Sequence, residues 1–230
     1  MKRELKGFTL AEVLITLGII GVIASLTLPS LTINIVKQQT GPALAKAINS
    51  LETTNKLALQ EGSARSLDQL TKSAKQQYFD EAIVDYMVWR VQNVQKPYYN
   101  YNGATAYATG ASTMHTTKDG ITYLHANEGP TALSAARKKV LSRGYSGDYY
   151  TVYIDVNGNA KGPNALGKDL FQVLVDTKGT VVPYGGVAWN AYTGNAVKWT
   201  GNGCANKKVH PTVPLSCAGS IADNGFRVIY

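Results

Sequence analysis

The sequence has little of what most enzymes need. It contains three histidines, and no two of them stand at the helical spacing of a zinc site. It has neither a G-x-S-x-G nucleophile elbow nor a G-x-x-x-x-G-K-[ST] phosphate loop. We therefore expect that the protein is not an enzyme. The alternative, a membrane-tethered hydrolase, would need a pocket around one of the isolated histidines, which are His115, His125 and His210.

Cysteine is also scarce, since the chain has only Cys204 and Cys217. Both lie in a Gly/Asn/Pro-rich segment with few apolar residues to hold it in place. A disulfide between them would supply that restraint and stabilise the fold by about 3 kcal/mol in the chain-entropy model. Such bonds persist in oxidising compartments, so the alternative is two free thiols in a cytosolic protein.

Charge is nearly absent from residues 8–28, FTLAEVLITLGIIGVIASLTL, where Glu12 is the single ionisable side chain. As a helix this run would be about 31 Å long, which matches the hydrocarbon core of a bilayer. The preceding MKRELKG segment is mainly basic and should remain in the cytoplasm. The sequence therefore predicts a single-pass inner-membrane protein whose remaining residues lie outside the cytoplasm.

A secretory signal peptide is the alternative interpretation of this N-terminus. Such a signal has a shorter apolar run that ends at a small-residue cleavage site. Here the run is long, and the change from polar to apolar sequence falls between Gly7 and Phe8. Burying the unpaired carboxylate of Glu12 would cost about 2.5–3.5 kcal/mol even on lenient insertion scales, so a compensating partner is expected.

Residues 6–15, KGFTLAEVLI, closely resemble the N-terminal cleavage and methylation motif of type IV pilins and type II secretion pseudopilins. The resemblance implies that a prepilin peptidase cuts between Gly7 and Phe8 and that the new amino terminus of Phe8 is methylated. It also implies that Glu12 helps to position neighbouring subunits in a filament. Pro29 stands where many members carry a helix-kinking proline.

The expected fold is α+β and pilin-like, with a long N-terminal helix packed on a small antiparallel β-sheet head. We divide the chain into a leader at residues 1–7, a membrane-spanning and filament-core helix at 8–36, the exposed half of that helix at 37–62, and a globular head at 63–230. A disturbance of the long helix is expected at Gly41 and Pro42, because proline lacks a backbone donor. Hydrophobic patterns predict further helices at 78–95 and 131–142, a hairpin at 114–125, and strands at 149–156, 170–175, 180–182 and 226–230.

A second resemblance covers residues 155–171, DVNGNAKGPNALGKDLF, which are similar to a loop of many pilin-like and pseudopilin heads. Its oxygen-rich side chains are of the kind that calcium prefers, although the spacing is not that of an EF-hand. The alternative is a set of Asx turns, in which the same side chains bind backbone donors. The candidate calcium ligands are Asp155, Asn157, Asn159 and Asp169.

These features predict a structural subunit of a type IV pilus or a type II secretion pseudopilus. Its expected partners are other pilin subunits, prepilin peptidase, and the assembly platform and ATPase of the same system. The alternative is a competence pilin that binds DNA through a basic head, since the net charge is +8. The basic residues are scattered along the sequence, so nucleic acid is not the expected partner. The choice between pilus and pseudopilus stays open.

Overall fold

The computed structural model describes residues 7–61, 84–90, 96–104, 114–125, 149–176, 178–185, 204 and 215–230. The chain divides into two compact units, Met1–Gln39 and Thr40–Tyr230. Helix α1 (Leu10–Gln60) contributes to both units. The expected α+β architecture, a long apolar N-terminal helix and an antiparallel sheet, is confirmed.

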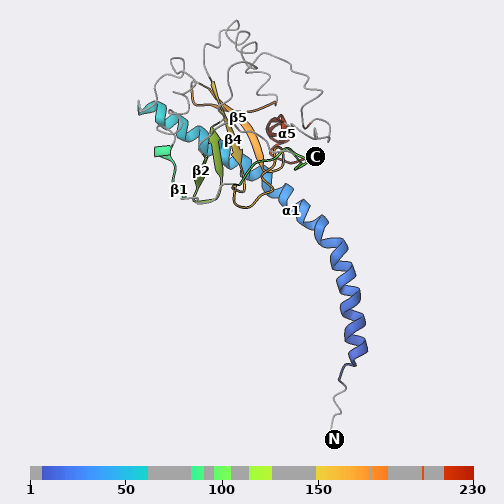
Figure 1. Ribbon diagram of the computed structural model, residues 1–230. Coiled ribbons are helices and arrows are strands. Elements are labelled where there is room, and N and C mark those ends of the chain that lie inside the picture. The colour runs from blue at the N-terminus through green and yellow to red at the C-terminus, as the bar shows by residue number, and fades with distance from the viewer. Residues whose placement is uncertain are drawn as a thin grey trace. The chain divides into compact units, whose positions relative to one another are not determined.

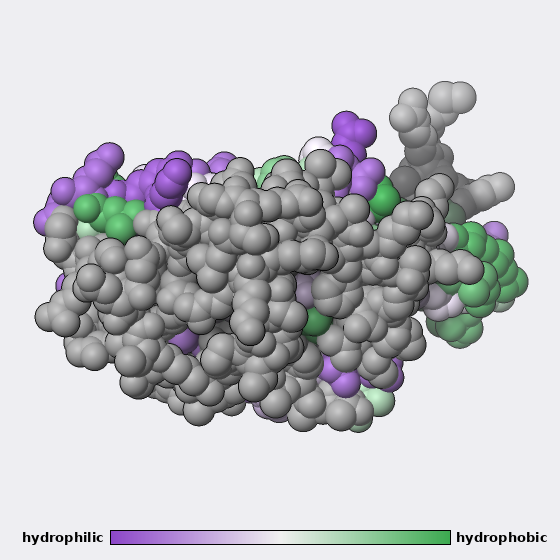
Figure 2. Space-filling view, turned by 90° about the horizontal axis from the view of Figure 1, so that it is seen from above, coloured by the Kyte–Doolittle hydropathy of each residue, from purple (hydrophilic) through white to green (hydrophobic). Residues whose placement is uncertain are grey.

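The first unit consists of the apolar part of α1. Within the described part of the chain, α1 is the one helix long and apolar enough to cross a membrane. The large apolar side chains of α1 between Leu10 and Val36 are exposed, as is Phe8 just before the helix. Elsewhere among the described residues, only Leu57, Val88 and Ile229 are large, apolar and exposed. Figure 2 shows the same segregation, because the largest green group is gathered in one place while purple side chains dominate the other coloured surface. This unit therefore requires an apolar environment.

The second unit begins with residues 40–60 of α1, which have one buried face. Leu44, Ala47, Ile48, Leu51 and Ala58 follow helical spacing and are buried on this face. The helix continues through Gly41 and Pro42 without ending there.

The head contains a six-stranded antiparallel sheet in the order β1-β2-β3-β4-β5-β6 (Figure 1). Consecutive strands are neighbours throughout, so each connection links adjacent strands. The strands are β1 (Trp89–Arg90), β2 (Met114–Thr117), β3 (Thr122–His125), β4 (Tyr149–Asp155), β5 (Leu170–Asp176) and β6 (Val181–Pro183).

Alternation along the strands gives the sheet two apolar faces. Tyr123, Val152 and Ile154 point to the core that α1 and the short helix α5 (Cys217–Asp223) share. The intervening Leu124 and Tyr153 belong to a second cluster, which lies on the opposite face. The sheet is therefore covered on both sides, with α1 on one face and loop residues on the other.

The hairpin and the central strands were predicted correctly, whereas two other predictions were wrong. Residues 84–90 lie within the predicted helix 78–95, but they form the 3-10 turn η3 (Val84–Tyr86) and strand β1. Trp89 is held in the sheet because its ring packs against those of His115 and Tyr123. Residues 226–230 form no paired strand, and the helix predicted at 131–142 lies outside the described residues.

Candidate functional site

The N-terminal motif places Thr9 and Glu12 in a capping box at the start of α1. Thr9 directly precedes the first helical residue, and its backbone N–H and its hydroxyl each donate to Glu12 Oε2 at 2.8 Å. The backbone N–H of Glu12 donates in turn to Thr9 Oγ1 at 3.3 Å. This reciprocal arrangement satisfies two of the orphan donors that every helix N-terminus exposes. The carboxylate therefore has hydrogen-bond partners within its own chain.

The capping box identifies a partner of Glu12 that the sequence interpretation missed. The spacing Thr-x-x-Glu before an apolar run is a visible signal for it. Gly7 and Phe8 precede the helix and are exposed, with Phe8 at 90% of its full accessibility. The peptide bond between them is therefore accessible in the structure.

A second candidate site is the loop formed by residues 155–169, here called the 155–169 loop. Its two ends meet where the Val156 N–H donates to the Asp169 carbonyl at 3.0 Å. Asp155 Oδ1 accepts from the backbone N–H groups of Asn157 and Gly158, at 3.2 and 2.9 Å. Its other oxygen accepts from the Tyr98 hydroxyl at 3.0 Å. Asp155 is therefore fully buried yet bonded at both oxygens.

Asp169 is held in the same way from the other end of the loop. Its two carboxylate oxygens accept the backbone N–H groups of Asn164 and Ala165, both at 2.7 Å. Burial raises the pKa of Asp169, against the opposing effect of these donors. Burial and the nearby Asp169 carboxylate raise the pKa of Asp155 to about 7. The two acids are therefore close enough to repel each other when both are ionised.

The asparagines of the loop differ in what their amides contact. The Asn159 side chain is engaged at both ends, since Oδ1 accepts from Lys96 N and Nδ2 donates to Lys96 O. Asn157 Nδ2 donates to the Gly162 carbonyl, and the Oδ1 atoms of Asn157 and Asn164 are buried without a hydrogen-bond partner.

These contacts test how the predicted ligands suit a calcium ion. The structure brings Asp155 and Asp169 together, and Asn157 has a carbonyl oxygen to spare. Two carboxylates and a neutral oxygen are appropriate calcium ligands. The backbone bonds to both acids are also those of Asx turns. Calcium binding stays a prediction.

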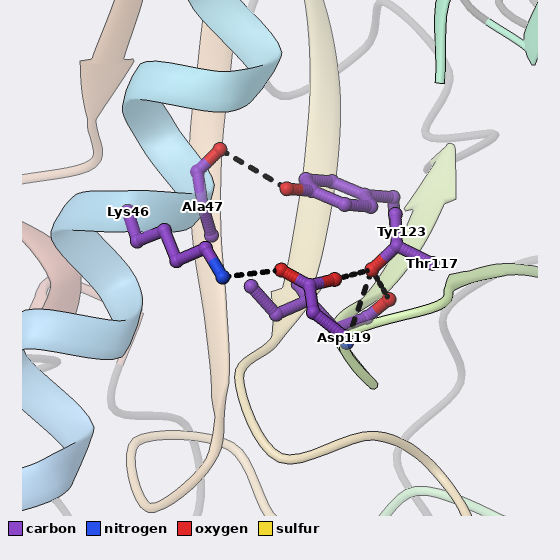
Figure 3. Close-up of polar contacts among 6 residues, drawn as sticks. Lys46, Ala47, Thr117, Asp119 and Tyr123 are labelled. Atoms are coloured by element: carbon purple, nitrogen blue, oxygen red, sulfur yellow. Dashed lines mark hydrogen bonds and ion pairs between the residues drawn. The ribbon is translucent and has the colours of Figure 1, made fainter. Parts of the chain in front are cut away.

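A third polar cluster joins α1 to the β2–β3 hairpin (Figure 3). Lys46 Nζ lies 2.6 Å from Asp119 Oδ2, and the Thr117 hydroxyl donates to the same carboxylate. The Tyr123 hydroxyl donates to the Ala47 carbonyl at 3.2 Å. Partial burial raises the pKa of Asp119, but the bonds from Lys46 and Thr117 bring it below its usual value. This cluster fixes the hairpin on the helix.

The two cysteines form the expected disulfide, with their Cα atoms 4.8 Å apart. Both are buried, and the Cys204 N–H donates to Ser216 Oγ at 3.1 Å. Of the histidines, His115 packs on Trp89, His125 is buried in β3, and His210 lies outside the described residues. Across the described ranges, no group of three or more His, Cys, Asp or Glu side chains could hold a metal ion.

Comparison with known proteins gives one finding. Residues 3–28 match the family model described as the prokaryotic N-terminal methylation motif, which is the signature of type IV pilins and pseudopilins. The match covers the leader from Arg3 onward, the capping box and the first part of α1. No curated protein and no solved structure matches the chain.

Proposed function

We propose that this chain is a structural subunit of a type IV pilus or a type II secretion pseudopilus, which prepilin peptidase processes and which assembles through α1. The observation that carries the proposal is the methylation motif at residues 3–28. It leads directly into a helix whose apolar side chains are exposed up to Val36. Such a surface needs lipid before assembly and neighbouring helices after it.

Processing would place a new amino terminus beside the capping box. Cleavage after Gly7 makes Phe8 the first residue, one position before the N-cap Thr9. The Glu12 carboxylate already accepts two donors from Thr9 and is compensated in part while the subunit is in the membrane. A methylated amine of Phe8 on a neighbouring subunit would supply the positive charge that the neutral donors of Thr9 cannot.

The head is suited to a compartment outside the cytoplasm. Its Cys204–Cys217 disulfide is of the kind that persists under oxidising conditions. The basic leader favours the same topology by the positive-inside rule. Assembly would then need the peptidase, the platform and the ATPase of the same system as partners.

The test is to express the tagged chain with its native partners and to analyse the sheared filament fraction. For a pilus and for a pseudopilus alike, we expect the mature chain to have an intact mass that lacks residues 1–7 and carries one added methyl group. If the assembled chain retains Met1, the proposal is wrong. Release of the chain into the sheared surface fraction supports a pilus, whereas a cell-bound chain whose deletion blocks protein secretion supports a pseudopilus.

Three variants separate the charge of Glu12 from its capping role. Glu12→Gln keeps an acceptor for Thr9 but removes the charge, and Thr9→Val removes the capping hydroxyl but keeps the charge. If charge pairing drives assembly, Glu12→Gln and Glu12→Val should insert normally and lose filaments, while Thr9→Val should retain most of them. Normal filament yield from Glu12→Val would refute the pairing role.

A further inference from the structure

The 155–169 loop forms hydrogen bonds to the backbone of residues 96–99, which are far away in the sequence. The Lys96 N–H donates to Asn159 Oδ1 at 2.6 Å, and Asn159 Nδ2 donates to the Lys96 carbonyl at 2.8 Å. A side-chain amide has the same donor and acceptor as a peptide group, so Asn159 pairs with Lys96 as a neighbouring strand would. These two bonds are to the main chain of Lys96, and its side chain adds a bond of its own from Nζ to the Ala160 carbonyl at 2.6 Å.

The same backbone pairing is repeated three residues later. The Tyr99 N–H donates to the Asn164 carbonyl at 2.7 Å, and the Leu166 N–H donates to the Tyr99 carbonyl at 2.9 Å. Lys96 and Tyr99 therefore have both of their main-chain groups bonded to the loop. Pro97, which lies between them, has no N–H to satisfy.

Tyr98 supplies the side-chain anchor of the segment. Its ring is buried in the apolar cluster on the face of the sheet opposite α1. At the far end of the ring, the hydroxyl donates to Asp155 Oδ2. Main-chain pairing at two residues together with one buried anchor is how peptide-binding modules recognise an extended ligand.

We propose that the 155–169 loop is a recognition site for an extended polypeptide segment, which residues 96–99 of the same chain occupy. Asn159 and Asn164 bind the main chain, and Asp155 selects tyrosine at the anchor position. The proposal does not depend on the N-terminal motif, so it stands even if the chain does not form filaments.

Occupation of the site fixes the turn that follows the bound segment. The Gly103 N–H donates to the Asn100 carbonyl at 2.8 Å, which closes a turn around Tyr101 and Asn102. Lys168 of the loop places its Nζ 4.9 Å from the centre of the Tyr101 ring. The site therefore presents this turn at the surface in a defined orientation.

The experiment measures hydrogen exchange of the full chain in detergent micelles with a chelator present. Asn159→Ala should accelerate exchange of the Lys96 and Tyr99 amides at least tenfold, while the amides of β4 and β5 keep their protection. Asn102→Ala is the matched control, because this asparagine is exposed and its side chain accepts from the Ala104 N–H, which lies outside the 155–169 loop. Unchanged exchange at Lys96 and Tyr99 in Asn159→Ala overturns the proposal.

Variants on the ligand side keep the test decisive if Asn159→Ala disturbs the whole loop. Lys96→Pro removes the N–H that Asn159 accepts and should accelerate exchange at Tyr99. Lys96→Ala keeps that N–H and removes only the bond from Nζ to the Ala160 carbonyl, so it should accelerate exchange at Tyr99 less. Equal exchange at Tyr99 in these two variants contradicts backbone recognition. Protection that appears only when calcium is added also overturns the proposal, because the metal would then be what holds the segment.

Discussion

Gly41→Ala should destabilise the head, although alanine is the better helix former by about 1 kcal/mol. Gly41 lies in α1, where residues 226–230, here called the C-terminal strap, cross the helix. A Cβ atom at position 41 would lie 1.8 Å from the Phe226 carbonyl oxygen and 2.7 Å from its carbon. Both are backbone atoms, so rotation of a side chain cannot relieve the clash.

The C-terminal strap would have to move as a unit to make room for the Cβ atom, and this movement determines how much stability Gly41→Ala loses. Phe226 has a positive φ of 59°, and Phe226, Val228 and Tyr230 pack partly buried against the core. Overpacking of this kind costs about 1–3 kcal/mol. Displacement of the strap would also weaken the bond from the Tyr230 hydroxyl to the Gly167 carbonyl. The weakened hydrogen bond costs about 1 kcal/mol, which offsets the gain of about 1 kcal/mol in helix propensity, so we expect a net loss of about 1–3 kcal/mol.

Thermal unfolding of the full chain in detergent, followed by intrinsic fluorescence, measures this effect. A loss of that size lowers Tm by about 2–12 °C for a domain of this length. Gly21→Ala is the control, because this glycine of the same helix has open space where a Cβ would lie. A Tm for Gly41→Ala equal to or above that of the parent chain would refute the packing argument.

Three further predictions concern the head. Cys204→Ser should lower its stability by about 3 kcal/mol, and non-reducing peptide mapping of the parent chain should recover the linked pair. Glu52→Ala should lower the free energy of unfolding in denaturant by about 1–3 kcal/mol, because Glu52 Oε2 accepts the Val181 N–H at 3.3 Å. Lys56→Ala removes only the ion pair with Glu52 and should lower it by less than about 1 kcal/mol. In chelator, the free energy of unfolding should fall as pH rises from about 4 to 7, because burial raises the pKa of Asp155 in the folded state to about 7 and the native state holds the proton that the unfolded state has released. Asp155→Asn should flatten this pH dependence. An unchanged pH dependence in the variant would contradict the attribution to Asp155.

Local patterns predicted the parts of the fold that depend on neighbours in the sequence. Asp119 and Gly120 define the β2–β3 turn, where Gly120 has a φ of 91°. Alternating apolar residues in β4 and β5 gave these strands nearly their observed bounds. The same kind of pattern failed at Trp89, because the stripe around it fits a helix and the rings that hold it in the sheet come from β2 and β3.

The sites show the same division between local and distant contacts. The capping box joins residues three positions apart, so its spacing is visible in the sequence. The paired hydrogen bonds between the Asn159 side chain and the Lys96 backbone join residues 63 positions apart, and no local pattern connects them. Residue type alone suggested a metal ligand at Asn159, since an amide oxygen suits a cation and a peptide N–H equally well.

Calcium binding by the 155–169 loop is the prediction for which two opposing effects must be compared. Two buried acids that raise each other's proton affinity would be relieved by a cation between them. Their oxygens, however, already accept five protein donors, so the loop is closed without a metal. The repulsion and the hydrogen bonds act on the same two carboxylates, so the test is whether added calcium changes the stability of the head.

If calcium binds the folded head alone, a hundredfold excess over Kd stabilises it by about 2.7 kcal/mol, which raises Tm by roughly 5–10 °C. Magnesium should give a smaller shift, because it demands a tighter octahedral shell. Asp169→Asn keeps an acceptor for a backbone donor but removes a charge, so it should abolish the calcium response while retaining most of the fold. Asn102→Asp, which adds an acid outside the loop, should respond as the parent chain does. Equal melting curves of the parent chain in calcium and in chelator would decide for Asx turns alone.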